Sequence, residues 1–230
     1  MALGRENPSC ERCGSTVRMR AIIRALSVEV FAKSLALRDF PERRDLRGLG
    51  LSDWDAYAVP LASKFHYTNT FYHRDPRLDI TRIDPALEGT LDFLIATDVF
   101  EHVPPPASVA FANARRLLKS GGTFVFSVPY AKEGPTREHF PELAEYELFR
   151  KDGQPALRNR TRDGRVQVFE GLVFHGGEGE TLEMRVFSEP SLVEEFSRAG
   201  FRDLRIHAEP DFEHGIYWSQ AWSLPMTAKR

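Results

Sequence analysis

The chain is poor in cysteine, nearly free of net charge and without long apolar runs, and each absence excludes a class of protein. Two cysteines in 230 residues are too few for a disulfide framework, so we expect a reducing, cytoplasmic location. A formal charge of −2 demands no nucleic-acid or anionic-membrane partner. No apolar run approaches the roughly 20 residues of a membrane helix, and the first ten residues lack the apolar core of a secretory signal. We therefore expect neither a nucleic-acid nor a membrane partner.

The two cysteines, Cys10 and Cys13, form a C-x-x-C pair near the start of the chain. Tetrahedral zinc needs four ligands, and the sequence has no second pair. The pair is therefore read as structural. A metal site completed by distant histidines or by another subunit is the alternative, and with it a zinc-dependent adaptor or nucleic-acid module.

Apolar residues are numerous enough for one domain of ordinary size: 42% of the chain is hydrophobic and 17 residues are Phe. Residues 91–130 are the most informative stretch. An apolar run at 91–97 is typical of a strand covered on both faces. A helix with apolar positions at a 3.6-residue period follows, then a glycine turn, and a second buried strand at 123–128. This order predicts a βαβ unit.

Three polar residues follow the first of these strands. Asp98, Glu101 and His102 can all bind or move protons. Open α/β sheets bind their ligands just outside the carboxyl ends of such strands. The sequence therefore predicts a ligand site at this point.

The same stretch carries a family resemblance. Its motifs are D-V-F-E-H-V at 98–103, R-x-L-K-x-G-G at 116–122 and S-V-P at 127–129. In this order and spacing they resemble the second half of class I S-adenosylmethionine-dependent methyltransferases, in the bacterial small-molecule and sugar branch. The resemblance implies an α/β fold, a Rossmann-like doubly wound sheet with a helical N-terminal cap and an antiparallel β-meander insertion. The implied cofactor is S-adenosyl-L-methionine.

The resemblance also implies cofactor-binding positions. The glycine-rich turn after the first strand corresponds to residues 48–53, where the usual acidic residue and third glycine are missing. Asp75 corresponds to the acidic residue that meets the ribose, Asp79 to the position near the adenine, and Asp98 to the methionine end. A plain turn is the alternative for the glycines and for Asp75. The cofactor-binding set is Gly48, Gly50, Ser52, Asp53, Asp75, Asp79 and Asp98.

Methyl transfer to an alcohol or phenol needs a base, and histidine is the natural choice near neutral pH. His102, His139 and His175 could each reach the strand-end pocket, and His102 is favoured. Asp98, Glu101 and His102 could instead hold Mg²⁺ or a transition metal. Three such closely spaced ligands converge with difficulty, so we expect no metal.

Two regions flank the core of the domain. Residues 1–44 are expected to hold the C-x-x-C segment and a cap helix whose Arg18, Arg20 and Arg24 form a solvated face, with capping of the cofactor pocket as the alternative. Residues 45–230 would form the methyltransferase-like domain, with a lid inserted at about 131–188. Strand-like segments separated by Asp-Gly turns predict an antiparallel meander there.

The meander is rich in arginine, and Arg158, Arg160 and Arg162 could form one row on a strand. Such a row suits an acidic acceptor, the alternative being a solvated face balanced by glutamates. The expected activity is methyl transfer to an oxygen, or less readily a nitrogen, of a small molecule or glycan. A protein of this fold that uses the cofactor otherwise, or has lost methyl transfer, is the other alternative. The sequence does not indicate an oligomeric state.

Overall fold

The computed structural model describes residues 4–175, 181–221 and 223–230. A six-stranded sheet forms the centre, in the spatial order β11-β12-β4-β3-β1-β2. Neighbours in the run from β4 to β2 are parallel, whereas β12 is antiparallel to both of its neighbours. The strands are β1 (Arg43–Leu51), β2 (Phe65–Thr70), β3 (Leu91–Thr97), β4 (Leu118–Ser127), β11 (Arg202–Ile206) and β12 (Met226–Lys229).

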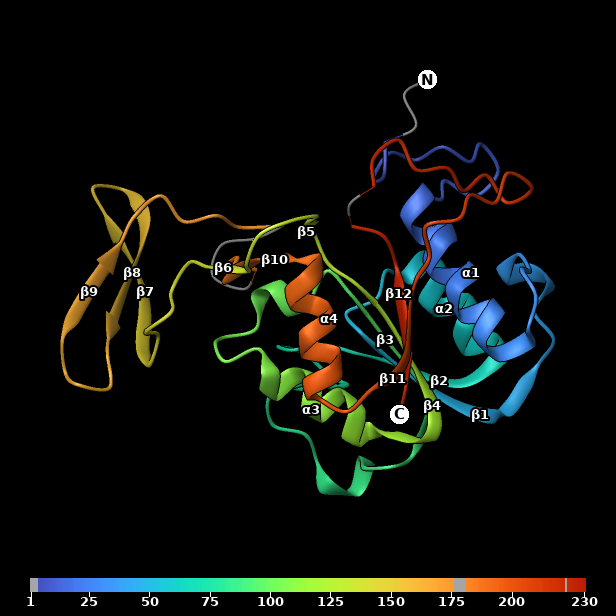
Figure 1. Ribbon diagram of the computed structural model, residues 1–230, viewed down its shortest axis with the longest axis horizontal. Helices are drawn as coiled ribbons and strands as arrows, with labels where there is room; N and C mark the ends of the chain where they lie inside the picture. The colour runs from blue at the N-terminus through green and yellow to red at the C-terminus, as the bar shows by residue number, and fades with distance from the viewer. Residues whose placement is uncertain (1–3, 176–180, 222) are drawn as a thin grey trace.

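Helices cover both faces of this sheet (Figure 1). On one face lie α1 (Val17–Phe31) and α2 (Asp55–Lys64), and on the other α3 (Ser108–Leu117) and α4 (Glu189–Arg198). Side chains alternate along β3, so that Phe93 and Ile95 join the core beneath α1 and α2 while Leu94 joins the core beneath α3 and α4. A strand covered on both faces is apolar throughout, as the run at 91–97 predicted.

The order of the strands creates a switch point. From β1 the chain goes to β2 on one side, and then returns to β3 on the other side of β1. The connections at the carboxyl ends of β1 and β3 therefore leave in opposite directions. In open α/β sheets a crevice for ligands forms at this point.

The insertion after β4 contains two small sheets. The first is antiparallel and consists of β7 (Glu145–Lys151), β8 (Gln154–Arg160) and β9 (Val166–Phe169), the meander expected from the turn pattern. It projects away from the central sheet (Figure 1). The second joins β10 (Arg185–Ser188) to β5 (Tyr130–Ala131) and β6 (Arg137–Glu138). The part of the expected meander at 176–180 lies outside the described residues.

Several predicted elements are wrong in position. The sequence also predicts a last strand at 217–224, but the last strand is β12 at 226–229. It predicts a short edge strand at 80–83 too, and none forms there, because Asp79 accepts hydrogen bonds from the backbone and side chain of Thr81 and closes a local turn. Helix α3 ends at Leu117, and β4 begins before the glycine pair instead of after it.

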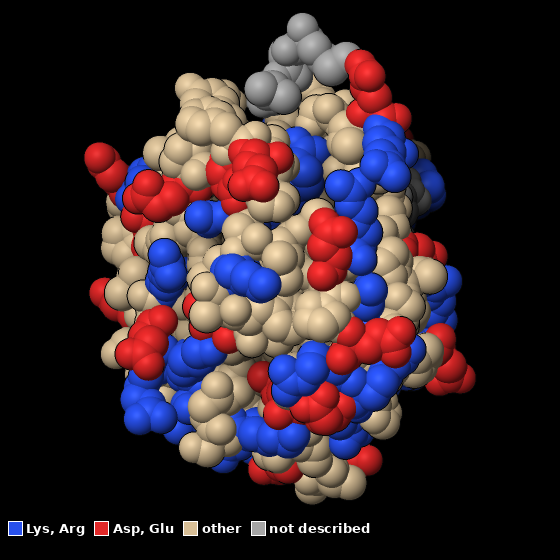
Figure 2. Space-filling model, turned by 90° about the vertical axis from the view of Figure 1, so that its right-hand side faces the viewer, with Lys and Arg blue, Asp and Glu red and all other residues tan. Residues whose placement is uncertain are grey.

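Charge is mixed over the surface of the molecule. On the face that Figure 2 turns to the viewer, Lys and Arg side chains are interspersed with Asp and Glu side chains. Among the described residues no helix has the length and apolar character needed to cross a membrane.

Candidate active site

The two glycines of the expected cofactor turn lie inside β1. A Cβ on Gly48 would come within 2.0 Å of the Phe93 ring. A Cβ on Gly50 would lie 2.0 Å from the hydroxyl of Tyr67 and 2.2 Å from the Asp53 carboxylate. The expected position in a turn is therefore wrong. Both glycines make room for side chains of the chain itself.

The turn after β1 begins at Ser52. Its φ of 56° is in the left-handed region that glycine prefers, and its amide donates to the Thr70 carbonyl at 2.7 Å. Ser52 thus has the backbone conformation expected of the third glycine, two positions after Gly50. Its side chain is exposed at the carboxyl end of β1.

Asp53 faces inward. Its carboxylate is only 3% exposed and accepts hydrogen bonds from Tyr57, at 2.7 Å, and from Tyr67. Burial raises the pKa of Asp53 to about 7, against the lowering effect of these hydrogen bonds. Both carboxylate oxygens are thus engaged within the protein, and Asp53 supports the turn from below.

The two acidic positions after β2 differ in availability. Asp75 is exposed. Asp79 is half-buried, and one of its oxygens accepts from the amide and hydroxyl of Thr81 at 2.8 and 2.7 Å. Both follow the strand that neighbours β1, where the resemblance placed the residues that meet the adenosine.

Asp98 follows β3 and meets two arginines that lie far away in the sequence. Its two oxygens lie 3.1 Å from Arg5 and 3.3 Å from Arg18. Burial opposes the charge of Arg18, but Asp98 and Glu6 outweigh it and raise the pKa of that guanidinium. The N-terminal segment and α1 therefore bring two positive charges to the carboxyl end of β3.

The other arginines of α1 are anchored too. Arg20 donates to the carbonyls of Ser15 and Gly215, each at 2.7 Å, and Arg24 pairs with Asp211 at 3.1 Å. The expectation of a solvated face is wrong, because the segment at 209–221 packs back over this helix (Figure 1). The alternative, in which the helix caps the strand ends, agrees with the position of Arg18.

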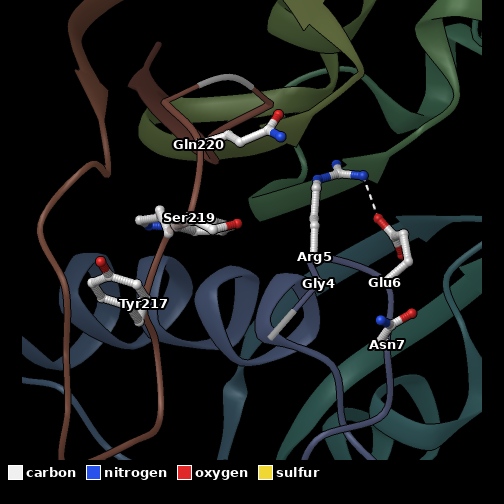
Figure 3. A pocket seen from close by; sticks show the side chains of 8 residues that line it. Gly4, Arg5, Glu6, Asn7, Tyr217, Ser219 and Gln220 are labelled. Carbon is white, nitrogen blue, oxygen red and sulfur yellow. Dashed lines mark hydrogen bonds and ion pairs between the residues drawn. The ribbon is translucent and has the colours of Figure 1, made fainter. Parts of the chain in front are cut away.

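A cavity of about 340 Å³ lies between the N-terminal segment and the loop at 217–220 (Figure 3). Arg5 lines it while also donating to Asp98 at 3.1 Å and to the Ser223 carbonyl at 3.3 Å. The cavity therefore lies beside the carboxyl end of β3. Its walls are formed by Gly4, Arg5, Glu6, Asn7, Tyr217, Trp218, Ser219 and Gln220.

Glu101 and His102 lie in a short 3-10 turn, η3 (Phe100–His102). The Glu101 side chain is 1% exposed, and its two oxygens have no hydrogen-bond partner in the described part of the chain. Burial and the nearby Asp98 charge raise the pKa of Glu101 well above its usual range. Burial lowers the pKa of His102. A hydrogen bond of 3.0 Å between its Nδ1 and the Leu182 carbonyl acts in the opposite direction and raises that pKa.

The three histidines expected as candidate bases lie together. The rings of His102 and His175 are 5.3 Å apart, edge to face. Glu183 joins the group: one of its oxygens lies 2.8 Å from Nε2 of His139 and the other 3.2 Å from Nε2 of His175. No sequence pattern singles out Glu183, because its position depends on how the chain returns from the meander.

Arg185 is a second residue that sequence reasoning missed. Its side chain is fully buried, pairs with Glu138 at 2.7 Å and donates to the carbonyls of Phe100 and Val103 at 2.8 and 2.6 Å. It thereby ties β10 to the turn that carries Glu101. In the sequence, nothing distinguishes Arg185 from the other arginines of the insertion.

The other meander arginines are exposed. Arg158 and Arg160 share a face of β8, while Arg162 lies beyond the end of the strand. Arg158 pairs with Glu147 at 2.8 Å and lies over the Phe149 ring. Arg158 is already paired with a glutamate. This face therefore agrees better with a solvated face balanced by glutamates than with a row of three arginines that bind an anion.

The C-x-x-C pair forms a tight turn, in which the Gly14 amide donates to the Cys10 carbonyl at 2.8 Å. Hydrogen bonds from Cys13 lower the pKa of the Cys10 thiol to about 7. Within the described residues no third Cys, His, Asp or Glu joins the pair in a metal-binding group.

Comparisons with known proteins agree with this geometry. A family model described as a methyltransferase domain matches residues 31–206. The fold is similar to the sugar N-methyltransferase KedS8 from Streptoalloteichus sp ATCC 53650, at 11% identity and TM-score 0.52 over 94% of this chain and 89% of that one. It is also similar to CalS10, an amino pentose methyltransferase from Micromonospora echinaspora solved with S-adenosylmethionine bound, at 15% identity and TM-score 0.50 over 94% and 92%. A search of curated proteins found no significant match.

The family match spans more than half of the chain, from the end of α1 to β11. The central sheet, with its switch point beside β1 and its antiparallel β12, is the Rossmann-like sheet that the resemblance implied. The chain belongs to the methyltransferase domain family and is a class I S-adenosylmethionine-dependent methyltransferase.

Proposed function

We propose that the enzyme transfers the methyl group of S-adenosylmethionine to an oxygen atom of a small molecule or glycan. The observation that carries this proposal is the group of three histidines, His102, His139 and His175, beside the turn that follows β3. An alcohol is a poor nucleophile until it loses its proton, and histidine accepts protons near neutral pH.

The residues at the strand ends fit the cofactor. Two carboxylates, Asp75 and Asp79, follow β2, and a carboxylate can accept hydrogen bonds from both ribose hydroxyls. Arg5 and Arg18 offer two guanidinium groups for the cofactor carboxylate, and Asp98 offers an acceptor for its amino group. Gly48 and Gly50 act indirectly, because the space above them is filled by Phe93, Tyr67 and Asp53.

The cofactor supplies a methyl group already activated by the sulfonium. The protein therefore chiefly holds the acceptor oxygen in line with that methyl group and removes the acceptor's proton. His102 is the first candidate for the base. Its Nδ1 lies on a carbonyl and so carries the proton, which leaves a free lone pair on Nε2. Burial also lowers the pKa of His102, which favours the neutral ring.

A nitrogen acceptor is the second candidate. The structural neighbours KedS8 and CalS10 are described as a sugar N-methyltransferase and an amino pentose methyltransferase. A neutral amine attacks without a base, so a histidine group would then matter less. An acidic acceptor has weak support, because the exposed Arg158 is already paired with Glu147.

Release of S-adenosylhomocysteine from panels of sugars, phenols and amines tests the proposal. With a hydroxyl acceptor, His102→Asn should lower turnover by about 10²–10⁴-fold, the usual contribution of a general base. His66→Gln, an exposed histidine on β2, is the matched control and should leave turnover unchanged. Turnover restricted to amines, or a His102→Asn variant as fast as the control, would contradict oxygen transfer.

A further inference from the structure

We propose that Glu101, His102 and His175 form a binding site for a divalent transition metal of the zinc type. One ligand atom from each of the three side chains lies within 4.8 Å of the other two. Carboxylate oxygen and imidazole nitrogen are ligands that zinc accepts. The metal site itself is independent of the proposed function. Only the role that the metal would have in the reaction rests on that function.

Glu101 is the first reason. Its carboxylate is 99% buried, yet neither oxygen has a hydrogen-bond partner among the described residues. Buried polar groups in proteins are nearly always paired, and an unpaired one calls for a further partner such as an ion. A cation between Glu101 and the two imidazoles supplies that partner.

His102 is the second reason. Its Nδ1 lies 3.0 Å from the Leu182 carbonyl, and its Nε2 lies 3.8 Å from a Glu101 oxygen. Metal-binding histidines typically donate their other ring N–H to a carbonyl or carboxylate, which fixes the ring and its tautomer. His102 already has this arrangement, with the free nitrogen directed at the side of Glu101.

His175 completes the group from the meander. Its Nε2 lies 3.2 Å from Glu183, so the same rule applies to its ring. Glu183 also meets His139 at 2.8 Å and thus orients a histidine outside the ligand group. From the sequence we expected no metal, and the metal alternative considered there took Asp98 as the third ligand, whereas Asp98 is held by Arg5 and Arg18.

The distances suit a site that closes on the ion. Bonds of about 2.0–2.1 Å in a tetrahedron place ligand atoms about 3.4 Å apart. A movement of at most about 1.4 Å by His175, whose side chain is 40% exposed, covers the difference. Three protein ligands leave a fourth position for water or an acceptor oxygen, as in catalytic zinc sites. In the metal-bound enzyme His102 would be a ligand and not the base, and an acceptor hydroxyl bound at the fourth position would instead lose its proton to solvent more readily before its oxygen takes the methyl group from sulfur.

Metal titration of chelator-stripped protein tests the site, with Zn²⁺ and Co²⁺ as probes and without cofactor or acceptor. The Cys10→Ser/Cys13→Ser double variant removes both thiols of the chain, which would otherwise compete for the added metal. We expect one Zn²⁺ per chain in that variant, and a Co²⁺ spectrum without thiolate charge transfer. His175→Asn should weaken binding at least tenfold, and Glu101→Gln likewise, while His66→Gln should have no effect.

His175→Asn keeps the test decisive, because His175 is exposed and its replacement leaves the core intact. The proposal is overturned if the wild-type chain binds neither ion at micromolar concentrations. It is equally overturned if the double cysteine variant loses the metal while His175→Asn retains it. Because no methyl transfer is measured, failure here is distinct from failure of the proposed reaction.

Discussion

At the scale of the residue, Gly48 and Gly50 are needed for the packing of the sheet near the carboxyl end of β1, where the cofactor is proposed to bind. Glycine is usually explained in this fold by the close approach of the cofactor. Here the space that a Cβ would occupy is taken by the Phe93 ring at one position and by Tyr67 and Asp53 at the other. Replacement of either glycine should therefore first affect stability.

Gly48→Ala should lower the free energy of unfolding by about 2 kcal/mol, the usual effect of overpacking a core. The new methyl group would meet the Phe93 ring at 2.0 Å. Urea unfolding measures the change. In a Phe93→Leu background the smaller side chain leaves room for the new methyl group, so Gly48→Ala should cost less there than it costs in the wild-type protein. A stable Gly48→Ala protein that has lost cofactor affinity would instead assign this glycine to the cofactor.

Asp53 should give the stability a characteristic pH dependence. Its pKa rises from an ordinary 3.8 to about 7 in the folded protein, so the folded state holds a proton that the unfolded state has lost. This stabilisation is complete below about pH 4 and disappears as the pH rises to about 7. Asp53→Asn lacks it.

The unfolding free energy of Asp53→Asn should therefore rise relative to wild type by up to about 4 kcal/mol between pH 4 and pH 7. Denaturant unfolding at a series of pH values measures the difference. His207, whose burial lowers its pKa to about 4, has the opposite sign and is common to both proteins, so it cancels. Parallel curves for the two proteins would show that Asp53 titrates normally.

At the scale of the element, one buried and two half-buried arginines join segments that are distant in the sequence. Arg185 on β10 holds the carbonyls of Phe100 and Val103, at either end of the η3 turn. Arg5 and Arg18 bring the N-terminal segment and α1 to Asp98. The position of the site therefore depends on three tethers as much as on the strand ends.

Arg185→Met should cost about 3–5 kcal/mol, because it leaves Glu138 and two buried carbonyls without their partner. Amides of the η3 turn should also exchange faster with deuterium. Arg158→Met is the matched control in the same insertion, and loss of its exposed pair with Glu147 should cost less than about 1 kcal/mol. Equal costs for the two variants would refute the tether.

The proposed contact of Arg5 and Arg18 with the cofactor carboxylate can be tested with ligands that contain or lack the amino-acid group. Arg5→Ala/Arg18→Ala should weaken binding of S-adenosylhomocysteine about tenfold or more, since each charged hydrogen bond contributes about 1.5–3 kcal/mol. Methylthioadenosine, which lacks the amino-acid group, should bind as before. The exposed Arg38→Ala is the control. An equal loss for both ligands would mean that the arginines shape the fold and not the carboxylate site.

Sequence reasoning found those elements whose signal is local. The βαβ unit at 91–130 has strong periodicity, and β3 and α3 lie where it placed them. The glycines were misplaced because a glycine in a strand and one in a turn look alike without knowledge of Phe93. The strand expected at 217–224 does not form at 217–221, the part of it before the undescribed residue 222, and the strand that pairs with β4 lies at 226–229.

The same distinction holds for the site. Asp98 and His102 were found because a strand end is a place that the local pattern defines. Arg5, Glu183 and Arg185 were missed because each reaches the site through a tertiary contact with a segment far along the chain. No periodicity records such a contact.

At the scale of the whole molecule, two apolar cores hold a sheet whose strand order reverses beside β1. Every group assigned to the reaction lies at one edge of this sheet, and the meander reaches back to the same edge through Leu182, Glu183 and Arg185. This arrangement supports the proposal of a cofactor at the switch point and an acceptor beside the histidines.

The most direct test of this account is calorimetry of the wild-type protein with S-adenosylmethionine and S-adenosylhomocysteine. We predict one site per chain for both ligands, with a dissociation constant of about 1 μM to 1 mM, the range in which enzymes commonly bind substrates. Absence of heat with either ligand over that range, from protein that is folded, would contradict the assignment of the strand ends to the cofactor.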